Sequence, residues 1–216
     1  MATNSSFLLT KRMTVSPGPY VRFAALFLCT TRSRLLGFDR VLASETVSLE
    51  RATPDAAPML RNLLELYVHD LSGIFPIELG PDGRFGYDKL PLYWEEPAVR
   101  HAFLIKRGGH VAGFAFATRG SPASDDPADL DVAEFFVLRG HRRSGVGRQA
   151  AIALWDAVPG HWVVRVSEAN RAGLTFWSGV IRSYTSGDFV ERTAPDAREG
   201  WRVFRFASRA WRLPEG

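Results

Sequence analysis

The sequence predicts a single domain of the mixed α/β class that begins near residue 47. From that point apolar residues recur with the period of strands and the period of helices in turn. The pair Gly108-Gly109 between two apolar runs is a strong signal for a two-residue β-hairpin. Hydrophobic residues make up 46% of the chain and aromatic residues 12%, which allows a core and excludes a wholly disordered or fibrous protein.

The first half of the domain is expected to hold a strand, a long helix, a loop, a short helix and the hairpin. Thr53-Pro54-Asp55 is a helix start, with an N-cap hydroxyl, proline at the first helical position and an acid in the first turn. Apolar residues then recur at helical spacing from Leu60 to Leu71. The strand, the loop, the short helix and the two hairpin strands are expected at residues 47–51, 73–86, 88–96, 102–106 and 111–118.

The second half is expected to begin with a central strand at 131–138, because this segment is apolar on both faces. One face should carry an apolar row that Glu134 interrupts: Leu130, Val132, Phe136 and Leu138. After a basic loop, one helix should end at Pro159-Gly160, and a second helix should be capped by Asn170 and ended by Gly187. Further strands are expected at residues 162–166, 189–192 and 203–207.

The net charge of +4 is concentrated at the N-terminus. Residues 1–46 carry six of the 27 Lys and Arg and two of the 23 Asp and Glu, and they lack periodicity. We expect a basic leader there, either a flexible tail or an over-long gene start with Met13 as an internal start. The domain at 47–216 is neutral, with an acidic part at 47–134 and a basic part at 135–216, so an anionic ligand is expected on the basic part.

The cysteine count and the hydropathy pattern restrict the class of protein further. Cys29 is the only cysteine, which excludes an intrachain disulfide and fits a reducing compartment. No apolar run approaches the length of a membrane span. We therefore expect a cytoplasmic protein without a membrane partner. The five histidines lack metal-ligand spacing, so no metal site is expected, and the neutral domain argues against nucleic acid.

The segment 137–147 carries the clearest chemical signal. A buried strand runs into a loop that contains Gly145 and Gly147, and a helix follows. Backbone N–H groups of such a loop can approach a pyrophosphate closely, and the helix N-terminus favours negative charge. Three arginines add charged donors: Arg142, Arg143 and Arg148. On the pattern alone, a solvated basic turn stays open as the alternative.

The run Glu-Phe-Phe-Val-x-Arg-x-x-Arg-Arg-x-Gly-Val-Gly, from Glu134 to Gly147, resembles motif A of the GNAT family of acetyl-CoA-dependent N-acetyltransferases. The segment Asn170-x-x-Gly-x-x-Phe-Trp177 resembles motif B, and the order of expected elements matches the family over residues 47–207. Segments 67–70, 83–87 and 176–181 resemble a poorly characterised bacterial subgroup. The resemblance implies an α/β (α+β) fold with a mostly antiparallel central sheet of six to seven strands and about four helices.

The resemblance also implies acetyl-CoA as the co-substrate. Backbone groups of the glycine loop would hold the CoA pyrophosphate, and those of the preceding strand the pantetheine arm. The cofactor-binding residues implied in this way are Val137, Leu138, Arg142, Arg143, Ser144, Gly145, Val146, Gly147, Arg148, Asn170 and Trp177.

Two catalytic groups are candidates. Many family members have a tyrosine at the position of Trp177 that can protonate the leaving thiolate, and an indole N–H cannot do so. Tyr184, two turns later, is a candidate substitute, with core packing as its alternative role. Glu134 is the candidate base, because burial of a carboxylate among apolar residues raises its pKa. A structural ion pair with an arginine is the equal alternative.

The acidic part of the domain is expected to form the acceptor wall. Tyr67, Asp70 and Tyr87 would contact a cationic amine through charge and cation–π interactions, and a solvated acidic surface is the alternative. The sequence thus predicts an N-acetyltransferase in which a small-molecule or peptide amine attacks acetyl-CoA directly in a ternary complex. A non-catalytic acyl-CoA-binding or sensing module is the alternative. A homodimer is left open, because the sequence is silent on oligomeric state.

Overall fold

The computed structural model describes residues 46–194 and 200–212. Every described residue belongs to one compact unit, Ser44–Gly216. Apart from Thr46, the basic leader expected at 1–46 lies outside the described residues. Among the described helices, none combines the length and the apolar character needed to cross a membrane.

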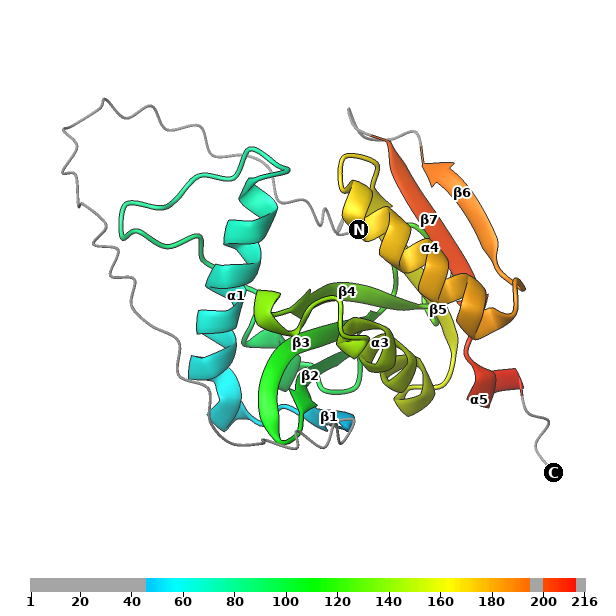
Figure 1. Cartoon of the computed structure of the whole chain (residues 1–216), viewed down its shortest axis with the longest axis horizontal. Helices are drawn as coiled ribbons and strands as arrows, with labels where there is room; N and C mark the ends of the chain where they lie inside the picture. The colour runs from blue at the N-terminus through cyan, green and yellow to red at the C-terminus, as the bar shows by residue number, and fades with distance from the viewer. Residues whose placement is uncertain (1–45, 195–199, 213–216) are drawn as a thin grey trace, which may run out of the picture. The chain divides into compact units, whose positions relative to one another are not determined.

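One seven-stranded sheet forms the framework of the domain (Figure 1). Its strands, in chain order, are β1 Val47–Arg51, β2 Arg100–Arg107, β3 His110–Arg119, β4 Leu130–Val137, β5 His161–Ser167, β6 Val190–Ala194 and β7 Trp201–Ala207. Their spatial order is β1-β2-β3-β4-β5-β7-β6, and every neighbouring pair is antiparallel except β4–β5. The predicted mixed fold with a mostly antiparallel sheet is confirmed.

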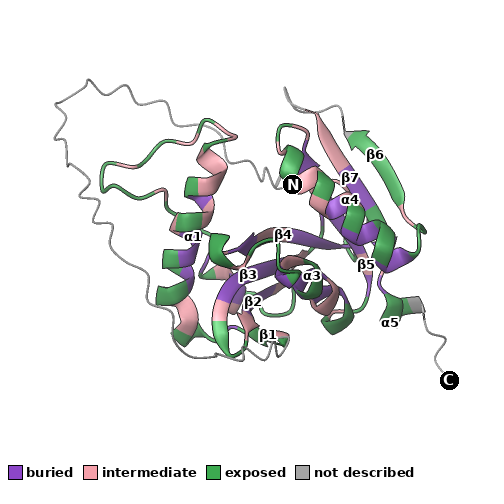
Figure 2. Ribbon diagram, in the orientation of Figure 1, coloured by how far each residue is buried: buried purple, intermediate pink, exposed green. Residues whose placement is uncertain are grey.

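Helices cover both faces of the sheet. They are α1 Ala57–Ser72, α2 Leu92–Glu95, α3 Val146–Ala157, α4 Arg171–Thr185 and α5 Arg209–Arg212, with 3₁₀ turns η1 Pro54–Ala56 and η2 Arg139–His141. One core cluster joins α1 and α2 to the sheet through Phe114 and Phe116, and the other joins α3 and α4 to it through Val164 and Phe204. The buried residues of α1 and α4 accordingly form stripes along these helices (Figure 2).

Three local predictions can be compared with the structure directly. Gly108 and Gly109 have φ values of 55° and 81°, as a tight hairpin turn requires. The Asn170 side chain accepts a hydrogen bond from the N–H of Gly173 at 2.9 Å and caps α4 as predicted. The capping role of Thr53 is wrong, because its side chain makes no cap hydrogen bond and Pro54 begins a 3₁₀ turn before α1.

Strand β4 contains a bulge that changes which side chains share a face. Phe116 pairs with Glu134, but the next residue of β3 pairs with Val132, so Ala133 is the extra residue. Leu130 and Val132 therefore pack on the α3 and α4 side, whereas Phe136 packs on the α1 and α2 side. The predicted common face for Leu130, Val132, Phe136 and Leu138 is wrong for this reason.

The two parallel strands in the centre of the sheet separate after a short contact. β4 pairs with β5 only at Leu130 with Trp162 and at Asp131 with Val163. Beyond Asp131, this edge of β4 has no strand partner among the described residues. Unpaired backbone groups of a strand are available to a ligand.

Candidate active site

The bulge on β4 directs Glu134 into a group of tyrosines. The Tyr67 hydroxyl, from α1, donates a hydrogen bond of 2.6 Å to Oε2 of Glu134. The Tyr87 hydroxyl, from the loop before α2, donates one of 3.1 Å to Oε1. Three segments far apart in the sequence thus meet at one carboxylate, and three residues predicted for the site lie together. We call Glu134, Tyr67 and Tyr87 the carboxylate cluster.

The environment of Glu134 raises the affinity of its carboxylate for a proton. Burial raises the pKa of Glu134, and the hydrogen bonds from Tyr67 and Tyr87 offset only part of this rise. Burial and the neighbouring carboxylate also raise the pKa of both tyrosines, so their hydroxyl groups remain hydrogen-bond donors. A carboxylate with a raised pKa binds a proton more readily at neutral pH than an exposed glutamate does.

Arg165 on β5 is a charged neighbour that the sequence reading did not select. Its guanidinium binds both carboxylate oxygens of Asp131 at 2.8 and 3.1 Å, and its charge lowers the pKa of Glu134. Arg165 is the one charged residue within the apolar run from Trp162 to Val166. A lone charge in a buried strand was the signal that could have identified it.

The glycine loop after β4 has the backbone form expected of an anion site. Gly145 has a φ of 84° and immediately precedes α3. The N–H groups of Val146, Gly147 and Arg148 in the first turn of α3 have no acceptor among the described residues. A Cβ on Gly147 would lie 3.2 Å from the ring of Phe176, so glycine keeps α3 close to α4. This helix start can accommodate a pyrophosphate.

The side chains of the loop differ in whether they make hydrogen bonds within the protein. Arg142 donates to the Val137 carbonyl at 2.7 Å and to Asp70 at 2.5 Å. The Arg148 guanidinium donates to the Ser183 hydroxyl, and the Ser144 hydroxyl donates to the His141 carbonyl, each at 2.8 Å. Arg143 is exposed, with a φ of 59°. Arg143 is therefore the loop arginine without an intramolecular partner in the described part of the chain.

Asp70 lies one turn after Tyr67 on α1, but it pairs with two arginines and does not contact Glu134. It binds Arg139 at 2.5 Å through Oδ1 and Arg142 at 2.5 Å through Oδ2. Burial alone would raise the pKa of Asp70, but the hydrogen bonds from both arginines outweigh it and lower that pKa. These contacts fix the turn that follows β4 beside α1 (Figure 1). The carboxylate predicted for acceptor binding is already engaged.

The end of β4 presents the Val137 N–H along the edge that faces away from β3. The N–H of Leu138 donates to the Ala112 carbonyl at 2.8 Å, so Leu138 faces β3. Because backbone groups alternate in direction along an antiparallel strand, the Val137 N–H points to the other edge, where β5 does not pair. Of the two residues expected at the pantetheine arm, Val137 therefore has its N–H on the edge of β4 where β5 does not pair. The N–H of Leu138 points to β3 instead.

The two aromatic residues of α4 belong to the core and not to the carboxylate cluster. Trp177 is 9% exposed and packs against Phe135 and Trp155. Tyr184 is 2% exposed, and its hydroxyl donates to Asp156 at 2.6 Å, with burial raising its pKa to about 12. The structure therefore supports core packing for Tyr184 instead of the acid role that the sequence allowed.

Among the residues that the structure describes, no three or more His, Cys, Asp or Glu side chains are grouped so that they could hold a metal ion. The chemistry available at this site is proton transfer at Glu134 and anion binding at the start of α3.

Two of three comparisons with known proteins found matches for this chain. The profile of the acetyltransferase (GNAT) family matches residues 60–177. An acetyltransferase crystal structure from Thermus thermophilus is 25% identical, with a TM-score of 0.52, covering 74% of this chain and 97% of that one. A comparison with curated protein sequences returned no significant match.

Two more distant structures share the fold. One is spermidine N-acetyltransferase from Vibrio cholerae in complex with CoA and spermine, with 12% identity, a TM-score of 0.52 and coverage of 75% and 95% of the two chains. The other is a Salmonella typhimurium acetyl transferase that modifies the N-terminal serine of ribosomal protein L7/L12, with 13% identity, a TM-score of 0.55 and coverage of 75% and 95%.

Proposed function

The chain belongs to the GNAT family of acetyltransferases, and from this membership we propose that it transfers an acetyl group from acetyl-CoA to a primary amine. The amine would attack the thioester directly in a ternary complex. The observation that carries this proposal is the position of Glu134, held by two tyrosine hydroxyls where β4 begins to separate from β5. The proposed proton acceptor would thus lie beside the strand edge that would hold the acyl donor.

Acetyl-CoA supplies an activated acetyl group, and the residues after β4 fit its diphosphate. The N–H groups of Val146, Gly147 and Arg148 would bind phosphate oxygens, because they lack acceptors in the described chain and lie at a helix N-terminus. The exposed Arg143 would add a charged donor. Along β4, the Val137 N–H would donate to the acyl-pantetheine arm and polarise a carbonyl group there.

Glu134 would accept the proton that the attacking amine must lose. Amines are mostly protonated at neutral pH, so a base with a raised pKa assists the attack. The hydrogen bonds from Tyr67 and Tyr87 fix the orientation of the carboxylate and leave it further lone pairs to accept this proton.

We propose that no side chain of α4 protonates the leaving thiolate. Trp177 and Tyr184 pack in the core, and the Tyr184 hydroxyl is bound to Asp156. A thiol has an ordinary pKa near 8.5, so a thiolate can leave near neutral pH and take its proton from solvent. The rate should therefore show no dependence on a tyrosine of α4.

The presence of Trp177 at the position of the family's usual tyrosine favours the second candidate function, a module that binds acyl-CoA without turnover. Calorimetry with acetyl-CoA and measurement of CoA release with an amine library distinguish the two. Saturable binding with release supports the enzyme, binding without release for any amine supports the module, and absence of binding contradicts both.

A glycine variant tests the binding loop itself. Gly145→Asp should abolish saturable acetyl-CoA binding, because it adds a carboxylate and strains a residue with a φ of 84°. Gly179→Asp on α4 is the matched control, since that glycine is exposed and a Cβ there meets no atom within 4 Å. Unchanged binding by Gly145→Asp would place the diphosphate elsewhere.

A further inference from the structure

Arg165 points to the same face of the sheet as Glu134. Along β5, Val164 and Val166 pack in the core cluster of α3 and α4. Arg165 lies between them, so it points to the opposite face, which α1 covers. Glu134 receives the hydrogen bond of Tyr67 from α1 and therefore lies on that face as well.

Asp131 holds Arg165 at the point where β4 and β5 separate. The pairing of the two strands ends at Asp131 with Val163, and Arg165 follows Val163 by two positions. The Arg165 guanidinium reaches back to Asp131 with hydrogen bonds of 2.8 and 3.1 Å, and the Ser121 hydroxyl donates a third to Asp131 at 2.9 Å. The side chain of Asp131 is 2% exposed and that of Arg165 is 27% exposed. The aspartate is thus enclosed, whereas part of the arginine borders solvent.

Arg165 acts on Glu134 through space and not through contact. In the described part of the chain, no hydrogen bond or ion pair joins these two side chains. Burial raises the pKa of Glu134, and the charge of Arg165 opposes that rise. Burial would lower the pKa of Arg165, but the hydrogen bonds to Asp131 and, to a smaller extent, the charge of Glu134 raise it. The arginine is thus close enough to influence Glu134 but is bound to a different carboxylate.

The other titratable groups that face Glu134 are three tyrosines and one aspartate. They come from α1, the loop before α2, α2 and β4: Tyr67, Tyr87, Tyr93 and Asp131. β3 contributes the apolar Phe116 opposite Glu134. Burial and the charge of Glu134 raise the pKa of Tyr93, so its hydroxyl stays protonated, as do those of the other two tyrosines. Arg165 is therefore the cation that lowers the pKa of Glu134 most, and its position determines how firmly Glu134 binds a proton.

We propose that Asp131 is a positioning residue, which holds the Arg165 guanidinium away from Glu134 and so lets that carboxylate accept the proton of the acceptor amine. Without Asp131, Arg165 would form an ion pair with Glu134, and a carboxylate in an ion pair is a weaker base. The ion pair with an arginine that the sequence allowed for Glu134 is formed by Asp131 instead. This inference rests on the proposed role of Glu134 in acetyl transfer.

A double-mutant cycle tests the proposal on the full-length protein. Asp131→Asn should lower kcat about tenfold at pH 7 and move the acid limb of the pH–rate profile to lower pH by about one pH unit. In an Arg165→Gln background, the same substitution should move the limb at most about one third as far, because the cation that would bind Glu134 is gone. Arg165→Gln alone should move the limb to higher pH. Equal shifts from Asp131→Asn in both backgrounds would overturn the proposal, since Asp131 would then act only through its own charge.

Asp129 and Arg205 supply the matched control. They form a bidentate pair of the same kind, with hydrogen bonds of 2.7 and 2.9 Å, but Arg205 is not among the groups with the largest effects on the pKa of Glu134. Asp129→Asn, alone or with Arg205→Gln, should leave the acid limb in place. A shift as large as that of Asp131→Asn would reflect the loss of any buried pair and would overturn the proposal. If Asp131→Asn does not fold, Asp131→Ser takes its place in the cycle, because the smaller side chain leaves room for water beside the guanidinium.

The outcome can be separated from that of acetyl transfer. Carbon NMR of the labelled carboxyl groups follows the titration of Glu134 without turnover, and Glu134→Gln assigns its signal. If no amine releases CoA, acetyl transfer is contradicted, but a titration midpoint that Asp131→Asn lowers only when Arg165 is present would still support the positioning of Arg165 by Asp131. A midpoint that Asp131→Asn leaves unchanged or raises would overturn it.

Discussion

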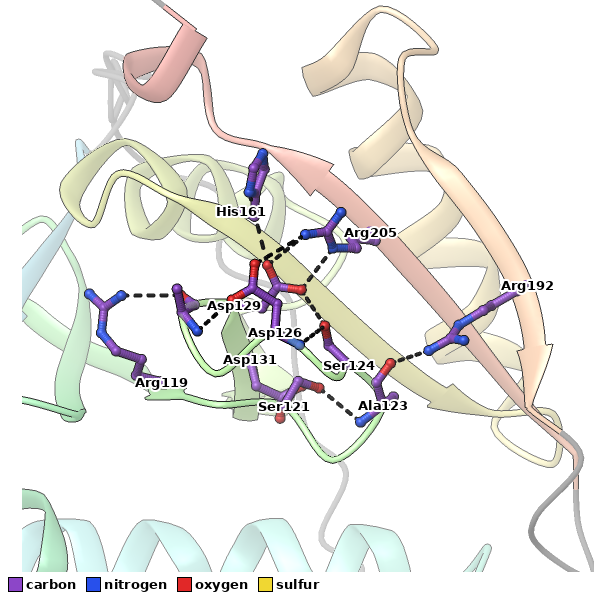
Figure 3. A network of polar contacts seen from close by, with 11 residues as sticks. Arg119, Ser121, Ala123, Ser124, Asp126, Asp129, Asp131, His161, Arg192 and Arg205 are labelled. Atoms are coloured by element: carbon purple, nitrogen blue, oxygen red, sulfur yellow. Dashed lines mark hydrogen bonds and ion pairs between the residues drawn. The ribbon is translucent and has the colours of Figure 1, made fainter.

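Asp129, just before β4, and Glu134, within the strand, are two carboxylates that differ in their partners. Asp129, just before the strand, is 0% exposed and receives two hydrogen bonds from Arg205, at 2.7 and 2.9 Å, and one from Ser124 (Figure 3). Glu134, five residues later, receives hydrogen bonds from two neutral tyrosines. One carboxylate has a bidentate cationic partner and the other has none.

This difference sets the two pKa values in opposite directions. Burial would raise the pKa of Asp129, but the hydrogen bonds from Arg205 and Ser124 outweigh it, and the pKa is lowered. At Glu134 burial prevails over its hydrogen bonds, and the pKa is raised. A carboxylate that stays ionised in a bidentate pair supports the fold, whereas one that binds protons readily can do proton chemistry.

The largest effect is expected for Glu134→Gln. Removal of the base should lower kcat at least about 100-fold at pH 7 and flatten the acid limb of the pH–rate profile. Full turnover with the same profile would contradict the role of Glu134.

Although Glu134→Gln should lower kcat, it should not lower the free energy of unfolding. Because the folded-state pKa of Glu134 is raised, its contribution is largest below the ordinary pKa of a glutamate and is lost as the pH rises through the folded value. Denaturant unfolding should therefore show Glu134→Gln at least as stable as the unsubstituted protein at pH 8. A large loss of stability would indicate a structural role.

Asp129→Asn should affect stability and spare catalysis. Loss of the charged partner of Arg205 should lower the free energy of unfolding by about 2 kcal/mol at pH 7. Because the folded-state pKa of Asp129 is lowered, this difference should shrink as the pH falls through that value. Asp126→Asn is the control, since Asp126 is exposed and lies 3.8 Å from Arg205. An equal loss in both variants would contradict the comparison.

Asp70 combines the two cases, because it is paired with arginines yet lies at the site. Asp70→Asn should raise KM for acetyl-CoA about threefold to tenfold with little change in kcat, since Arg139 and Arg142 would hold the loop less firmly. Asp55→Asn, an exposed acid before α1, is the control. A lower kcat with unchanged KM for acetyl-CoA would favour the acceptor role that the sequence suggested.

Local patterns predicted most of the framework. The hairpin glycines, the Asn170 cap and the central strand follow from the chemistry of single residues and short periods. The bulge at Ala133 could not be predicted, because β4 is apolar on both faces and a shifted register leaves the same pattern. Phe136 and Leu138 therefore share the face of Glu134 as predicted, whereas Leu130 and Val132 lie on the opposite face.

The partners of the site residues depend on contacts between distant segments. Tyr67 and Tyr87 were expected near the acceptor, and their hydrogen bonds to Glu134 span 67 and 47 residues. The pairing of Asp70 with Arg142 spans 72 residues. The composition of residues 47–134 indicated an acidic acceptor wall. It could not show which of these carboxylates are already bound by other groups of the protein.

The smallest and most specific effect is expected for Tyr87→Phe. The Tyr87 hydroxyl lowers the pKa of Glu134, so its removal should raise that pKa and move the acid limb of the kcat/KM profile to higher pH. The rate at the optimum should fall only about threefold, because Tyr67 still orients the carboxylate.

Tyr184→Phe is the matched control for this prediction. It removes a buried tyrosine hydroxyl that donates to Asp156, outside the carboxylate cluster. It should cost about 1 kcal/mol of stability and leave the pH profile unchanged. If both tyrosine variants shift the profile equally, the shift arises from a general loss of packing and not from the hydrogen bond to Glu134. If only Tyr87→Phe shifts it, the hydroxyl sets the pKa of the base directly.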